Sequence, residues 1–178
     1  MHFRNIKIGR TTRFILQIAS IVPLTSAFRR NIHFPELLFD LGLTGHRDEG
    51  FLIKLESQDQ GIDYQPVIAK IKGCGFYFPF PVPPDGVLCA MKISAMLTRQ
   101  KGRDFYDVMF LLSQTAPDYN FLSKRYGVSN LVELKHATAK MLQSVDLNKK
   151  MRDFEHLLFN KSNSEKIIRV GMFIKELS

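Results

Sequence analysis

The sequence predicts an α+β fold, in which a small sheet comes first and a helical C-terminal half follows. Up to about Pro84, hydrophobic and polar residues alternate, which is the period of a β-strand. Beyond Pro84 the hydrophobic residues recur every three or four positions, which is the period of an amphipathic helix. With 178 residues, 45% of them hydrophobic, the chain is large enough to bury a sizeable core. We therefore expect a β-rich domain over residues 1–83 and a helical region over residues 84–178.

The first 24 residues have a basic start followed by a short apolar run, a pattern similar to that of a secretory signal. Gln17 and Pro23 interrupt this run, which is also too short to cross a bilayer as a helix. We therefore expect a strand or a helix here, at the start of a truncated domain, and a protein without a membrane partner.

Four elements are expected between this segment and Pro84. Residues 34–43 read as a short helix that Gly42 or the following turn closes. The alternation in residues 50–58 predicts a strand, and two further strands are expected at residues 65–73 and 75–83. Prolines end the last of these strands, whose aromatic run suits an interrupted core strand or an edge strand better than a surface that stacks bases.

The helical half is expected to begin with a helix that Asp85 caps and that continues to about Gln100. A second helix follows over residues 102–114, with Phe105, Val108 or Met109, and Leu112 on its apolar face. One or two more helices are predicted in residues 120–145, and residues 150–160 and 164–177 complete the chain. A helix-turn-helix around Gly127 is a weaker interpretation, because such helix breaks are common.

Charge is unevenly spread along the chain, whose net charge is +8. Residues 1–30 hold 6 basic and 0 acidic residues, residues 31–120 hold 8 and 11, and residues 121–178 hold 11 and 6. Basic ends around a mildly acidic centre suit a nucleic-acid partner, although a solvated basic surface gives the same pattern. The two cysteines form neither a disulfide framework nor a zinc pattern, which favours a cytoplasmic location.

Lys92 is the only charged residue between Val87 and Leu97, and a lysine in such an apolar setting requires a partner. In a helix, Lys92 and Arg99 share one face, while Asp104 and Asp107 share a face of the next helix and repel each other. Lys92, Arg99 and Arg103 are therefore candidate partners of the two aspartates, and so is a metal ion. Either a salt-bridge network that docks the two helices or a catalytic site gives this pattern.

The segment from Pro79 to Gln114 resembles the C-terminal motifs of the AbiEii/AbiGii-type nucleotidyltransferase toxins. The shared features are an apolar helix that carries Lys92, the later Arg99, and the Arg-Asp-x-x-Asp run that begins at Arg103. A leucine-rich helix and a Lys-x-Glu strand, at Lys54 to Glu56, are also similar, so that the resemblance covers about residues 34 to 125.

This resemblance implies a partial nucleotidyltransferase fold of the polymerase-β type, with residues 1–83 as a remnant of its core. Members transfer a nucleoside monophosphate from a nucleoside triphosphate to an acceptor such as tRNA, use Mg²⁺, and serve as toxins in toxin–antitoxin and phage-defence (abortive infection) systems. The implied partners are a nucleoside triphosphate, tRNA or another nucleic acid, and an antitoxin protein. The resemblance also implies a role for each candidate site residue. The catalytic residues would be Lys92, Asp104 and Asp107. Phosphate would be bound by Lys54, Arg99 and Arg103, and a metal ion by Glu56.

One part of the family pattern is missing from the sequence. The Gly-Gly or Gly-Ser turn and the Asp-x-Asp strand that bind the metals are not found, and residues 1 to 33 do not match. The chain is therefore expected to bind a nucleotide weakly and not to transfer it efficiently alone, as a truncated or inactive relative. The alternative is a basic helical module without catalytic activity that binds RNA or a protein partner.

Overall fold

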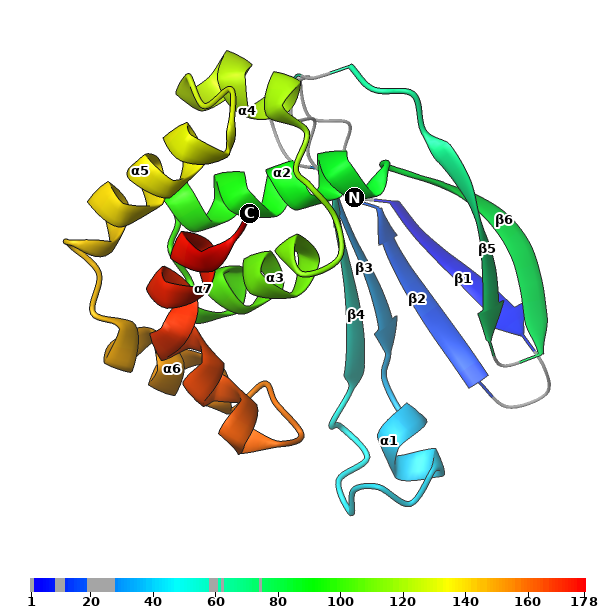
Figure 1. The fold of residues 1–178 in the computed structure, drawn as a ribbon. Helices are drawn as coiled ribbons and strands as arrows, with labels where there is room; N and C mark the ends of the chain where they lie inside the picture. Colours follow the sequence, from blue (N-terminus) through cyan, green and yellow to red (C-terminus); the bar gives the residue numbers. More distant parts are fainter. Residues whose placement is uncertain (1, 9–11, 19–27, 58–60, 62, 74) are drawn as a thin grey trace. The chain divides into compact units, whose positions relative to one another are not determined.

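The computed structural model describes residues 2–8, 12–18, 28–57, 61, 63–73 and 75–178. The chain divides into two compact units, residues 1–62 and residues 63–178. Every described strand ends by Val82, and, apart from one short helix, the helices start at Asp85 (Figure 1). The predicted α+β class is therefore confirmed. The predicted division of the chain at residues 83 and 84 follows this change of secondary structure, and as a domain boundary it stays a prediction.

The first unit is built around a four-stranded antiparallel sheet with the order β1-β2-β3-β4. The segment for which a strand or a helix was expected at the start of the chain contains two strands. The strands are β1 (His2–Ile8), β2 (Thr12–Ile18), β3 (Phe28–Phe34) and β4 (Phe51–Ser57). The short helix α1 (Leu37–Asp40) lies between β3 and β4 and ends near Gly42, whose φ of +68° is in the left-handed region that favours glycine.

The second unit starts with an antiparallel hairpin of β5 (Val67–Gly73) and β6 (Phe76–Val82). These are the two strands predicted from alternation and from the aromatic run. β6 has β5 as its neighbour in a two-stranded sheet, so both are edge strands, and Pro79 and Pro81 lack the N–H that a further strand would need. The large apolar side chains of the hairpin are exposed, with Phe76 70% accessible.

Seven helical elements follow in the described part of the chain. They are α2 (Asp85–Thr98), α3 (Gly102–Leu112), α4 (Tyr119–Tyr126), α5 (Leu131–Leu142), α6 (Leu147–Glu155), the 3₁₀ helix η1 (Lys161–Arg169) and α7 (Val170–Glu176). The predicted cap of the first of these is wrong. Pro84 has the extended conformation of the N-cap position, and Asp85 is already in the first helical turn, where its charge favours the positive end of the helix dipole.

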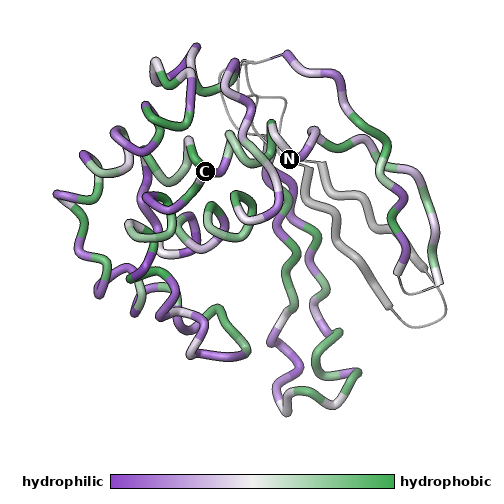
Figure 2. Tube along the Cα trace, viewed as in Figure 1, coloured by the Kyte–Doolittle hydropathy of each residue, from purple (hydrophilic) through white to green (hydrophobic). Residues whose placement is uncertain are grey.

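The core of the second unit forms around α2 and α3, which pack against each other. α2 also contacts α4, and α3 contacts α6, η1 and α7. Hydrophobic residues run along both central helices (Figure 2), and Ile93, Met96, Phe105 and Val108 have no solvent exposure. Because these residues recur at helical spacing, each helix buries one face and leaves the other for polar side chains.

Candidate functional site

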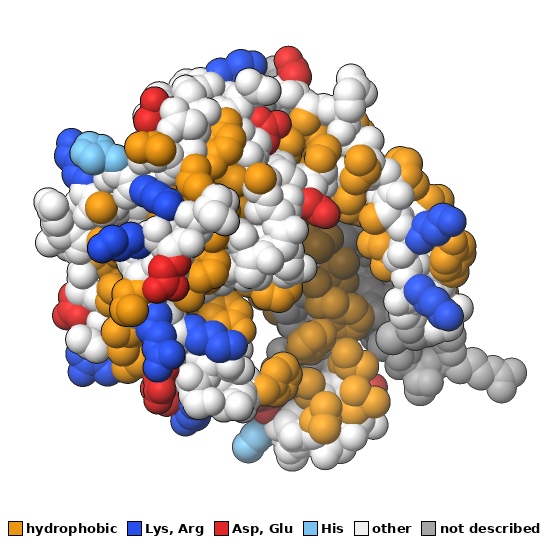
Figure 3. Space-filling view, in the orientation of Figure 1, with side chains coloured by type: hydrophobic (Ala, Val, Ile, Leu, Met, Phe, Trp, Pro, Cys, Tyr) orange, Lys and Arg blue, Asp and Glu red, His pale blue; other side chains and the backbone are white. Residues whose placement is uncertain are grey.

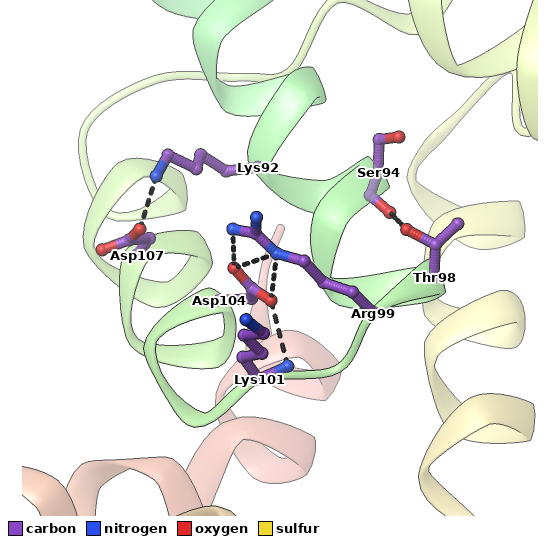
Figure 4. A network of polar contacts seen from close by, with 7 residues as sticks. All are labelled: Lys92, Ser94, Thr98, Arg99, Lys101, Asp104 and Asp107. Carbon is purple, nitrogen blue, oxygen red and sulfur yellow. Dashed lines mark hydrogen bonds and ion pairs between the residues drawn. The ribbon is translucent and has the colours of Figure 1, made fainter. Parts of the chain in front are cut away.

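The polar faces of α2 and α3 bring together four of the five charged site candidates that the sequence singles out in this unit. Lys92 and Arg99 come from α2, and Asp104 and Asp107 come from α3 (Figure 4). The two cations lie seven residues apart, or about two helical turns, so they point the same way. The predicted convergence of these four side chains is therefore what the structure shows.

The first pair of the site joins Lys92 to Asp107, with 2.6 Å between Nζ and Oδ2 (Figure 4). About one third of each side chain is exposed, 34% for Lys92 and 33% for Asp107. This contact explains why an apolar helix carries a lysine, because the ammonium has a carboxylate partner and retains access to water.

The second pair joins Arg99 to Asp104, a carboxylate with no solvent exposure. The Arg99 Nε donates to Oδ2 at 2.8 Å and to Oδ1 at 3.1 Å, while Nη2 also donates to Oδ1 (Figure 4). These hydrogen bonds, together with the negative charge of Asp104, raise the pKa of the Arg99 guanidinium above its ordinary value. A bidentate pair of this kind fixes the plane of the guanidinium. The Arg99 side chain nevertheless keeps 43% of its surface exposed to solvent.

The connection between the two helices sets this geometry. Gln100 has a φ of 52°, a left-handed conformation that non-glycine residues rarely adopt, and the chain reverses there. The carboxylate of Asp104 then accepts the backbone N–H of Lys101 at 3.0 Å, which caps the start of α3. Both Asp104 oxygens therefore already accept hydrogen bonds, and its predicted catalytic role stays a prediction.

The two predicted site residues on β4, Lys54 and Glu56, belong to the first unit. The Glu56 carboxylate lies 3.1 Å from the Lys54 ammonium and 2.9 Å from Arg29 on the neighbouring strand β3. The hydrogen bond from Lys54, assisted by the positive charges of Lys54 and Arg29, lowers the pKa of Glu56. The predicted approach of Glu56 to the helical residues stays a prediction.

Arg103, the remaining candidate, belongs to neither of the two ion pairs and lines a pocket between α3 and α6. Lys101, Lys150 and Asp153 line the same pocket, whose volume is about 340 Å³. Lys101, Lys150 and Asp153 were not predicted as site residues. The sequence feature that could have indicated this pocket is Gly102. A glycine at the start of a helix permits close contact with the backbone of another element, here α6.

The carboxylates of the site do not offer a ready set of ligands for Mg²⁺. Asp104, Asp107 and Glu56 each contact one or more cationic side chains. Within the described residues, no group of three His, Cys, Asp or Glu side chains is arranged to hold a metal ion. Magnesium needs several oxygen ligands in near-octahedral geometry, so these residues do not fit the ion in the arrangement seen.

The geometry thus consists of two facing helices that carry a lysine and a bidentate arginine, each paired with an aspartate. The comparison with known families adds the class of protein. Residues 52–161, more than half of the chain, match the family described as nucleotidyl transferase AbiEii toxin, type IV toxin–antitoxin system. The chain belongs to this family of nucleotidyltransferase-like toxins. Neither the curated proteins nor the solved structures yielded a match.

The helices of the described residues were also compared with the requirements of a membrane span. None of them combines the length and the apolar character that crossing a bilayer demands.

Proposed function

We propose that the chain is a nucleotidyltransferase-like toxin whose α2–α3 site binds the phosphates of a nucleoside triphosphate. The observation that carries this proposal is the pair of cations on one face of α2. Lys92 and Arg99 are each oriented by an aspartate, and each keeps a substantial part of its side chain in solvent. Because phosphoryl transfer depends mainly on charge neutralisation and positioning, oriented and accessible cations are the groups that it needs.

The roles of the site residues follow from their contacts. Lys92 and Arg99 bind phosphate oxygens, Asp107 positions Lys92, and Asp104 positions Arg99. In the family reaction the acceptor oxygen bonds to the α-phosphorus, pyrophosphate leaves with the electron pair of the broken bond, and the acceptor proton passes to a base. An acceptor such as tRNA and an antitoxin partner are further parts of the proposal, which family membership supports.

We expect this chain alone to bind a nucleoside triphosphate weakly and to transfer nucleotides inefficiently. A transferring phosphoryl group develops negative charge that this class of enzyme neutralises with metal ions held by carboxylates. Asp104 and Asp107 are instead held by Arg99 and Lys92. Mg²⁺ remains part of the proposed reaction on the basis of the family, without assigned ligands among the described residues.

The test measures binding of a labelled nucleoside triphosphate to the wild-type chain, Lys92→Ala and Lys140→Ala. Lys140 is an exposed lysine on α5, so its replacement makes the same change in charge outside the site. We expect Lys92→Ala to weaken binding about tenfold, and Lys140→Ala to change it less than twofold. Equal effects of the two variants would show that binding reflects net charge alone.

Asp107→Asn separates a binding lysine from a lysine that only docks two helices. Asparagine keeps an oxygen that can accept a hydrogen bond from the Lys92 ammonium and position it, while the competing negative charge is removed, so triphosphate binding should be kept or strengthened although the ion pair is gone. A loss of binding equal to that of Lys92→Ala would indicate that the pair has a purely structural role.

Transfer is assayed with labelled nucleoside triphosphates, Mg²⁺ or Mn²⁺, and tRNA. Robust label transfer that disappears in Lys92→Ala would show that the chain builds a metal site from residues not identified above. The alternative function, a basic module that binds RNA or a protein without catalysis, would give RNA binding with no dependence on Lys92 and no triphosphate binding.

A further inference from the structure

The pocket between α3 and α6 is a second cationic site in the helical unit, next to the ion pairs but separate from them. Its volume is about 340 Å³, within the range of small-ligand pockets, and it lies between residues 101–103 and residues 150–157. An added Cβ at Gly102 would lie 2.2 Å from the Lys150 carbonyl oxygen and 2.7 Å from the Phe154 Cβ. The start of α3 therefore packs directly on the backbone of α6, which fixes the two walls of the pocket.

The charges around the pocket favour an anion. Lys101, Arg103 and Lys150 contribute three cations, against the single carboxylate of Asp153. None of these four side chains is within ion-pair distance of another charged group among the described residues. The pocket also lies at the N-terminal, positive end of the α3 dipole, which adds to the attraction of an anion.

The surroundings of the pocket indicate a ligand with many negative charges rather than a small free anion. α6 packs against η1, and both elements carry exposed lysines and arginines. Figure 3 shows Lys and Arg side chains over this side of the helical unit, with fewer Asp and Glu side chains among them. The exposed cations of α6 and η1 are Lys149, Arg152, Lys161, Lys166 and Arg169.

We propose that this pocket binds a phosphate group of a nucleic-acid backbone. The proposal rests on the proposed function, because it assigns a binding place to the acceptor, whereas Lys92 and Arg99 bind the donor. Lys150 and Arg103 approach the phosphate from α6 and α3, and the neighbouring cations contact adjacent phosphates. A pocket for one phosphate with cations around it positions a backbone without reading its sequence.

The test is binding of a fluorescent single-stranded RNA oligonucleotide at several salt concentrations. We expect Lys150→Ala to weaken binding about five- to tenfold and to reduce the slope of log affinity against log salt by about 0.7, the value for one phosphate contact. Lys140→Ala on α5 should change affinity less than twofold. Equal losses in both variants, or no loss in either, would overturn the proposal.

A substitution that is expected to tighten RNA binding provides a test that misfolding cannot imitate, because a misfolded chain would bind RNA more weakly. Asp153→Asn removes the one carboxylate of the pocket and should tighten RNA binding about two- to threefold, because like-charge repulsion ends. Glu176→Gln makes the same change of charge on an exposed residue of α7 and should leave affinity within a factor of 1.5, about the error of the measurement. Weaker RNA binding in Asp153→Asn would overturn the proposal.

Two further measurements complete the test. One distinguishes a nucleic-acid phosphate from a free phosphate, and the other distinguishes this pocket from the α2–α3 site. If tripolyphosphate binding depends on Lys150 while RNA binding does not, the pocket takes free phosphates and the nucleic-acid assignment is wrong. Lys92→Ala should keep RNA binding while losing the triphosphate. RNA binding that depends on Lys150, in a chain that binds no triphosphate, would refute the proposed function and leave the pocket assignment standing.

Discussion

Single residues in the core of the helical unit show how polar groups are accommodated there. Ser94 is buried, and its hydroxyl lies 2.6 Å from the Tyr126 hydroxyl, so both groups have a partner. Thr138 is 1% exposed, and its hydroxyl has no hydrogen-bond partner. A buried hydroxyl without a partner loses its hydration without compensation, which destabilises the folded state.

This difference predicts opposite effects of two substitutions. Thr138→Val replaces the hydroxyl by a methyl group of similar shape, and we expect it to raise the free energy of unfolding by about 1 kcal/mol. Ser94→Ala removes one member of a satisfied pair and should lower this free energy by about 1 kcal/mol, because the half-buried Tyr126 hydroxyl keeps only its longer contact, 3.3 Å, to the Ser94 carbonyl oxygen. Denaturant titration of both variants checks the prediction, which a loss of stability in Thr138→Val would contradict.

Cys89 provides a pH-dependent test of burial. Burial raises the pKa of its thiol from 9.0 to about 12. Between pH 9 and 12, the Cys89 thiol is therefore protonated in the folded state and ionised in the unfolded state. The stabilisation of the folded state that the protonated thiol provides is complete below pH 9 and declines as the pH rises. Between pH 8 and 10.5, the wild-type chain should lose about 2 kcal/mol of stability relative to Cys89→Ala.

The free energy of unfolding is measured at pH 8 and at pH 10.5 for the chain with Cys89 and for Cys89→Ala. Both carry Cys74→Ser, so that no second thiol titrates. The cavity left by Cys89→Ala offsets the comparison by a constant amount at every pH, so the change with pH isolates the titration. A difference between the two chains that stays constant from pH 8 to pH 10.5 would mean that the Cys89 thiol ionises normally.

At the scale of elements, the docking of α2 on α3 shows what the sequence can and cannot predict. Helical spacing was sufficient to place Lys92 and Arg99 on one face and to predict that they meet Asp104 and Asp107. It did not decide which cation joins which carboxylate. That choice depends on the left-handed turn at Gln100, because Gln100 reverses the chain at the end of α2.

Contacts between elements distant in the sequence were beyond prediction for a related reason. The ion pair of Glu56 with Arg29 was not predicted, because Arg29 lies opposite Glu56 in the β3–β4 register and no local pattern encodes that register. Two helices, α4 and α5, separate the element that contains Lys150 from the one that Gly102 begins, so only the tertiary packing brings these residues together. Asp85 was assigned to the cap because its side chain suits that position, whereas Pro84 occupies it.

The contact between α3 and α6 makes a prediction about Gly102. Gly102→Ala would place its Cβ 2.2 Å from a backbone oxygen of α6, which cannot move without shifting the helix. We expect a loss of about 2–3 kcal/mol in the free energy of unfolding, despite the better helix propensity of alanine. The matched control is Gly171→Ala on α7, where the nearest atom is the flexible end of Leu142 at 3.2 Å.

Thermal and denaturant unfolding of the two glycine variants provide the measurement. Gly171→Ala should change the free energy of unfolding by less than about 1 kcal/mol in either direction, because Leu142 can move slightly and the helix gains from alanine. Similar stability of Gly102→Ala and Gly171→Ala would show that α6 does not pack on the start of α3 as described.

At the scale of the whole molecule, the buried core that the described residues form lies in the helical region. Every buried hydrophobic residue found in the described part of the chain lies between Val87 and Ile174. The hairpin β5–β6 belongs to the same compact unit as the helices, yet its large apolar residues are exposed. Stability is therefore expected to differ within this unit, because local opening is easiest where few apolar groups are buried.

Hydrogen exchange of backbone amides measures this difference along the chain. Amides in the second half of α2 and in α3 after its first turn should exchange only on global unfolding, because Ile93, Met96, Phe105 and Val108 are fully buried around them. Amides of β5 and β6 should exchange by local opening at a much lower free energy, since an isolated two-stranded hairpin is marginally stable. Addition of tripolyphosphate should slow exchange near Lys92 and Arg99 if that site binds phosphate, and should leave β5 and β6 unchanged. Equal protection of the hairpin and of α2 would mean that another surface covers the apolar residues of the hairpin in solution.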